Sequence, residues 1–116
     1  MRASLTDGWP ALRRWKLIAP SLFWSEASAG LRQLEYRRDI SRREAAAALS
    51  LLLAAPVETV PSRELITPAF DLAVQLGWAK TYDAEYVALA RQLGAPLLTI
   101  DAALAATARR FVAVVP

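Results

Sequence analysis

Residues 81–101 read TYDAEYVALARQLGAPLLTID and carry the clearest fold signal in the chain. Thr81 is placed to cap a helix that ends at Gly94, a residue type favoured just after the last helical turn. Leu97 to Ile100 then form a short apolar run with the length of a strand, and residues 101–110 form another helix. Because the run is continuous rather than alternating, it predicts a strand buried on both faces, as in a parallel sheet.

The alternation of helix and strand continues through the rest of the chain. Ser41 and Glu44 have the spacing of a capping box, in which each side chain accepts a hydrogen bond from the other residue's backbone N–H at a helix start. The predicted strands span residues 17–19, 57–60, 97–100 and 111–115, and the predicted helices span residues 10–15, 21–38, 42–55, 63–76, 81–93 and 101–110. This pattern predicts one α/β domain over residues 1–116, with three α/β/α layers around a short parallel sheet.

The composition limits the chemistry that the chain can perform. Its 116 residues, 55% of them apolar, are enough for the core of one domain. The absence of Cys and His excludes disulfides, thiolate ligands and imidazole bases. A metal would have to bind oxygen ligands, which favours Mg²⁺ or Mn²⁺. The net charge of +3 weakly favours a polyanionic partner. A genome whose base composition favours Arg codons can, however, produce such a charge without any functional demand.

Two absent patterns concern localisation. The sequence has no run of about 18 apolar residues, the length that a membrane-spanning helix needs. It also has no charged start followed by an apolar stretch and a small-residue cleavage site. We therefore expect a cytoplasmic protein that does not enter a membrane.

Three acidic residues occupy positions that predict a metal site. Asp101 directly follows the apolar run, and ligands of open α/β sheets bind beyond the carboxyl ends of the strands. Asp83 lies in the first turn of a helix among apolar neighbours, where a desolvated carboxylate needs a partner such as a cation. Glu26 falls at the margin of an apolar helix face, and Gly30 one turn later removes side-chain bulk beside its carboxylate.

Each of these acids also has a purely structural explanation. Asp is a common helix cap, and this role alone would account for Asp101. An anion in the first turn is stabilised by the helix dipole, which would account for Asp83. Glu26 could reach solvent along its flexible stem. The metal site is favoured by the three positions together rather than by any one of them.

These residues also carry a resemblance to a known family. Three segments resemble the successive motifs of PIN-domain ribonucleases, and among these the VapC-type toxins of bacterial toxin–antitoxin pairs. The segments are Leu17-Ile18-Ala19-Pro20-Ser21-Leu22 followed by Glu26, then Tyr82-Asp83-Ala84 with Tyr86 and Ala88-Leu89-Ala90, and finally Leu97-Leu98-Thr99-Ile100-Asp101. The resemblance runs from about residue 11 to the end of the chain.

The resemblance implies both a fold and an activity. It implies a three-layer α/β fold, Mg²⁺ or Mn²⁺ bound by clustered carboxylates, and cleavage of RNA. It further implies a homodimer and an antitoxin protein that blocks the site. Glu26 matches the family's second acid, Asp83 the third and Asp101 the fourth, while Thr99 matches a frequent hydroxyl neighbour.

The family's first acid has no counterpart in this chain. Family members open with an apolar strand that ends in Asp, and residues 3–6 lack the apolar character of such a strand. We therefore expect the domain to be incomplete at its N-terminus, without the strand that lies at the middle of the sheet, between the strands of residues 17–19 and 97–100.

Both lines of argument predict metal-assisted hydrolysis of phosphodiester bonds. The carboxylates would fix the ion, and the ion would activate a water molecule for in-line attack on phosphorus. One alternative is a binding remnant, which keeps the antitoxin and dimer surfaces but has lost catalysis together with the first acid. Another is an unrelated small α/β module in which Glu26, Asp83 and Asp101 lie far apart.

Overall fold

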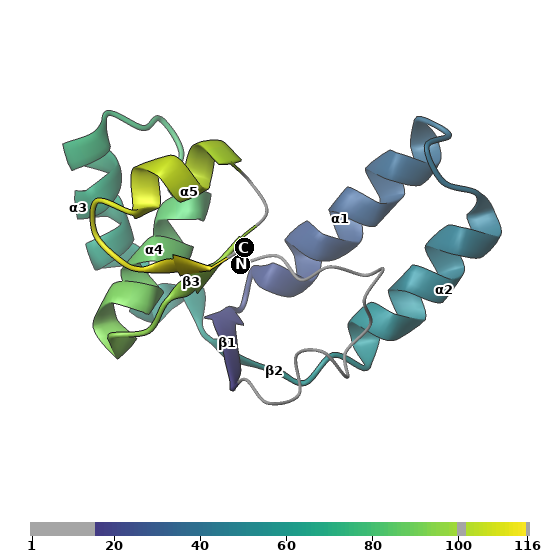
Figure 1. Ribbon diagram of the computed structural model, residues 1–116, viewed down its shortest axis with the longest axis horizontal. Coiled ribbons are helices and arrows are strands. Elements are labelled where there is room, and N and C mark those ends of the chain that lie inside the picture. The colour runs from purple at the N-terminus through teal and green to yellow at the C-terminus, as the bar shows by residue number, and fades with distance from the viewer. Residues whose placement is uncertain (1–15, 100–101, 116) are drawn as a thin grey trace.

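The computed structural model describes residues 16–99 and 102–115, which form a mixed α/β domain. Figure 1 shows helices α1 and α2 as a hairpin that extends away from strands β1 and β2, with α3, α4 and α5 on the other side of these strands. The helix predicted at residues 10–15 lies outside the described residues. The elements in chain order are β1 (Leu17–Pro20), α1 (Phe23–Tyr36), α2 (Arg42–Leu53), β2 (Val57–Val60), the 3-10 turn η2 (Ser62–Glu64), α3 (Ile66–Leu76), α4 (Tyr82–Leu93), β3 (Leu97–Leu98), α5 (Ala102–Ala108) and β4 (Val114–Val115).

The strands pair in parallel, as the sequence predicts. β1 pairs with β2 in a register that sets Leu17 opposite Val57, and the α1–α2 hairpin forms the crossover between them. β3 pairs with β4, and α5 forms that crossover. Within residues 16–99 and 102–115 these strands make two separate two-stranded pairs. The proposed central strand before residue 17 therefore remains a prediction.

Several predicted elements are shorter in the structure, and two of them have a clear local reason. The helix predicted over residues 63–76 is divided into η2 and α3, because Pro68 has no N–H and its ring clashes with a helical carbonyl four residues earlier. α3 therefore starts at Ile66 and holds Pro68 in its first turn. The strand predicted over residues 111–115 begins only at Val114, because the amides of Phe111 and Val112 both donate to the Ala108 carbonyl at the end of α5.

The N-terminal ends of α2 and α4 differ in how they are capped. At α2 the capping box is confirmed: the Glu44 amide donates to Ser41 Oγ at 3.0 Å, and the Ser41 amide donates to Glu44 Oε1 at 2.9 Å. Thr81 holds the corresponding position at α4, but its side chain makes no capping hydrogen bond. The prediction that Thr81 caps this helix is therefore wrong. A capping side chain needs the extended backbone that Ser41 has (ψ 165°), whereas Thr81 is helical (ψ −3°).

Left-handed residues end three of the helices. Gly77 (φ 70°) follows α3, and Gly94 (φ 60°) follows α4 at the helix end that the sequence predicts. After α1 the same conformation is taken by Arg38 (φ 65°), whose amide donates to the Glu35 carbonyl at 2.9 Å. Each turn satisfies carbonyls that the last helical turn leaves free.

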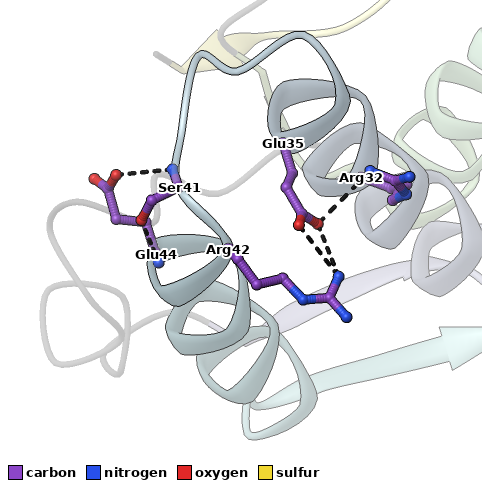
Figure 2. Close-up of polar contacts among 5 residues, drawn as sticks. All are labelled: Arg32, Glu35, Ser41, Arg42 and Glu44. Carbon is purple, nitrogen blue, oxygen red and sulfur yellow. Dashed lines mark hydrogen bonds and ion pairs between the residues drawn. The ribbon is translucent and has the colours of Figure 1, made fainter.

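The arginine-rich end of the α1–α2 hairpin is held by ion pairs. Figure 2 shows Arg42 of α2 and Arg32 of α1 converging on Glu35. Arg42 Nη1 lies 3.2 Å from both carboxylate oxygens of Glu35, and Arg32 Nη1 lies 3.7 Å from one of them. Arg37 Nε lies 3.5 Å from Asp39. Of these pairs, the one between Arg42 and Glu35 joins the two helices of the hairpin, although the Arg42 side chain remains largely exposed.

The core is built around α4. Its residues Ala84 to Ala90 are all buried, and the helix packs against α3, β1 and β3. Val87 and Leu65 have no exposed surface. Trp24 and Trp78 pack half-buried against this core. None of the helices in the described part of the chain is long and apolar enough to cross a membrane.

Candidate metal and nuclease site

Glu26 lies in the first turn of α1, just beyond the carboxyl end of β1. Its side chain is half-buried, and the hydroxyl of Tyr86 on α4 donates a hydrogen bond of 2.7 Å to its Oε1. Since Tyr86 itself is buried, the bond fixes the carboxylate against the core instead of leaving it on the surface. The alternative of an edge glutamate that reaches solvent along its stem does not describe this arrangement.

Gly30 does not owe its place in α1 to tight packing. A Cβ atom added there would meet no atom within 4 Å. The sequence argument that Gly30 makes room beside Glu26 therefore receives no support from packing. We have no physical account of a glycine at this position, which weakens the helix by about 1 kcal/mol relative to alanine.

Asp83 is the second residue of α4 and is half-buried. It precedes Tyr86 by three residues, so the two side chains project from the same face of the helix, the face that reaches Glu26. The N-terminal end of α4 also carries a partial positive charge that stabilises an anion. Asp83 thus shares a face of α4 with Tyr86, the residue that hydrogen bonds to Glu26.

Asp101 lies outside the described residues, so the structure does not place the third predicted ligand. Its neighbour Thr99 is buried, and the Thr99 amide donates to the Val115 carbonyl at 3.3 Å, which extends the β3–β4 pairing by one residue. The predicted position of Asp101 beyond the carboxyl end of β3 remains a prediction.

Glu85 is an acid that the sequence analysis did not select. It is only 6% exposed, although its neighbours on the buried face of α4 are apolar. Burial raises the pKa of its carboxyl group above the ordinary value; a hydrogen bond from Ser62 opposes this shift, and the negative charge of Glu26 adds to it. A signal was present in the sequence: Glu85 is the one charged residue between Ala84 and Ala90, a stretch whose other members are all apolar.

Two serines complete a polar group at the ends of β1 and β2. The Ser62 amide donates to Ser21 Oγ at 3.0 Å, and the two hydroxyl oxygens lie 3.3 Å apart. The Ser21 amide donates to the Val60 carbonyl at 2.8 Å, which ties the end of β1 to the end of β2. Ser62 therefore stands at the start of η2 with its hydroxyl directed to Glu85. This is the edge of a parallel sheet at which ligands usually bind.

The donors at this edge suit a hard divalent cation. All of them are carboxylate or hydroxyl oxygens, the ligands preferred by Mg²⁺ and Mn²⁺. Glu85 Oε1 is buried and has no hydrogen-bond partner among the described residues, a condition that a cation would relieve. Within residues 16–99 and 102–115, however, no three acidic side chains come close enough together to hold one ion.

The comparison with protein families agrees with this geometry. The model of the PIN domain family matches residues 10–110. The chain belongs to the PIN domain family. PIN domains are generally nucleases, they act on RNA, and they typically use divalent metals. No curated protein matches the chain closely enough to refine this assignment.

Family membership also accounts for the fold. The mixed α/β architecture with short parallel strand pairs is that of a PIN domain. In this PIN domain the structure brings Glu26 to the α4 helix that carries Asp83, two elements far apart in the sequence.

Proposed function

We propose that this PIN domain is a metal-dependent endoribonuclease, the toxin component of a VapC-type toxin–antitoxin pair, and that it hydrolyses phosphodiester bonds of RNA. The observation that supports this most directly is the 2.7 Å hydrogen bond from Tyr86 to Glu26. It holds one predicted ligand against the helix that carries another, at the edge of the sheet where substrates bind.

In this proposal Glu26, Asp83 and Asp101 hold Mg²⁺ or Mn²⁺. The cation, when bound, supplies charge stabilisation at the phosphate and activation of water. Tyr86 orients the Glu26 carboxylate, and Asp83 comes from the first turn of α4, the helix that carries Tyr86. Asp101 is included as a ligand only because of its place in the sequence motif Leu97-Leu98-Thr99-Ile100-Asp101.

The proposed partners are RNA, an antitoxin protein and a second copy of the chain, all in the cytoplasm. The net charge of +3 supports binding of a polyanion. Support for the homodimer comes from α3, where three apolar side chains at a spacing of four residues are exposed: Ile66 (54%), Phe70 (58%) and Val74 (67%). Such a row on one helix face is typical of a protein contact surface.

Cleavage of RNA tests the activity. The purified chain is incubated with labelled single-stranded RNA in Mg²⁺, in Mn²⁺ and in EDTA, with single-stranded DNA of the same sequence as the substrate control. We expect metal-dependent cleavage of RNA that falls by about two orders of magnitude or more in Glu26→Gln, Asp83→Asn and Asp101→Asn. Asp71→Asn, an exposed carboxylate on α3, is the matched control and should retain activity. Equal activity in EDTA would refute the metal dependence.

Growth and mass measurements test the toxin role and its alternative. Expression of the chain should arrest a bacterial host, and co-expression of a small adjoining gene should relieve the arrest. Sedimentation should give the mass of a dimer, and Phe70→Asp should reduce it to that of a monomer. A chain that dimerises and binds the adjoining protein but leaves RNA intact would be the binding remnant instead.

A further inference from the structure

Glu85 is the buried polar side chain that the proposed ligand set leaves unexplained. The residue is 6% exposed, and its Oε1 has no hydrogen-bond partner among the described residues. A buried carboxylate oxygen without a hydrogen-bond partner destabilises the fold, and more so when the carboxylate is charged. A ligand that binds this oxygen would remove the destabilisation.

The neighbours that act on the Glu85 carboxyl group include a hydroxyl and a second carboxylate. Ser62 hydrogen bonds to the carboxyl group, and Glu26 is close enough for its charge to act on it. Tyr86, the next residue of α4, donates its hydroxyl to Glu26. The ion pairs formed by the described residues involve Glu35, Asp39 and Glu58, and neither Glu26 nor Glu85. Within residues 16–99 and 102–115, neither of these two carboxylates forms an ion pair with a cationic side chain.

We infer that Glu85 is a further ligand of the divalent cation, which it shares with Glu26. The buried Oε1 of Glu85, which has no hydrogen-bond partner among the described residues, is the atom that would bind the ion. This inference rests on the proposed metal dependence and adds a ligand to it.

The number of carboxylates is sufficient for such a site. Mg²⁺ usually keeps several water molecules and is bound through one or two carboxylates. A Glu26–Glu85 pair can therefore bind the ion although no group of three acids is found within the described residues. A cation between the two carboxylates would cancel the repulsion that each exerts on the other.

Titration with Mn²⁺ tests the inference. Binding is measured by calorimetry for the wild-type chain, Glu85→Gln and Glu64→Gln, the last being an exposed glutamate of η2 with the same change in charge. We expect Glu85→Gln to raise the Kd for Mn²⁺ by about tenfold or more, since even residues that only orient a ligand change metal affinity by about 10- to 100-fold. Glu64→Gln should match the wild type.

The outcomes separate this inference from the proposed function. If the wild type binds Mn²⁺ and Glu85→Gln binds it equally well, the Glu85 role is refuted while the metal site stands. If the wild type binds no Mn²⁺, both are refuted. Should Glu85→Gln fail to fold, crystals of the wild type soaked in Mn²⁺ decide the matter: an anomalous peak within about 2.6 Å of a Glu85 oxygen supports the inference, and a peak coordinated without Glu85 overturns it.

Discussion

Tyr86→Phe should destabilise the protein through the loss of a single hydroxyl group. Tyr86 is 5% exposed, so its ring is packed and phenylalanine can keep that packing. The hydroxyl donates to Glu26 Oε1 at 2.7 Å, a short bond to a charged acceptor. The variant therefore removes the hydrogen bond between α4 and α1 without leaving a large cavity.

The size of the effect follows from the geometry. A hydrogen bond to a charged group contributes about 1.5 to 3 kcal/mol. Because the Glu26 carboxylate is half-buried and can bind water when Tyr86 is lost, we expect the lower end, about 1.5 kcal/mol. With an unfolding entropy of about 2.1 cal/mol/K for each residue, the 116 residues give about 0.24 kcal/mol/K. The melting temperature should therefore fall by about 6 °C.

A double-mutant cycle isolates the Tyr86–Glu26 bond from other contacts of Tyr86, which has further interactions. Melting is followed by circular dichroism without divalent metal for the wild type, Tyr86→Phe, Glu26→Ala and the double variant. We expect a coupling free energy of about 1 kcal/mol. Tyr82→Phe, which removes a hydroxyl from an exposed tyrosine of the same helix, is the control and should change the melting temperature by less than about 1 °C. A coupling near zero would refute the view that Tyr86 holds Glu26.

Five further substitutions test the fold and its charges. Ser41→Ala removes half of the capping box and should lower the melting temperature by about 4 °C in a thermal melt. Gly30→Ala should raise the free energy of unfolding by about 1 kcal/mol in urea, because a Cβ meets nothing there, whereas Gly77→Ala should lower it because φ is 70°. Leu65→Ala empties a fully buried site and should cost about 2 to 5 kcal/mol in the same assay. Since burial raises the pKa of Glu85, the metal-free protein should lose stability as the pH rises from about 4.3 through that raised pKa; Glu85→Gln should remove this loss, and melts across pH that show identical slopes would contradict it.

The sequence determined most of the local structure, and it did so through short-range hydrogen bonds. The Ser41 capping box and the glycines after α3 and α4 each involve residues a few positions apart, so their geometry depends little on the rest of the fold. The continuous apolar runs predicted parallel pairing, and the observed pairs are parallel. At Thr81 the prediction of a side-chain cap failed. The residue type favours a cap, but the backbone angle of Thr81 decides whether its side chain can form the capping hydrogen bond.

Only the tertiary structure decided what lies beside each acidic side chain. Tyr86 and Glu26 are 60 residues apart, and their hydrogen bond exists because α4 packs against β1 while α1 starts at the end of that strand. Glu85 could be read from the sequence as an ordinary surface charge of an amphipathic helix, but α4 is buried on every side along this stretch. Burial is a property of the elements packed around a helix, and these come from distant parts of the chain. The sequence could therefore name Glu26 and Asp83 as candidate ligands, whereas the buried oxygen of Glu85 became visible only once the helices were in place.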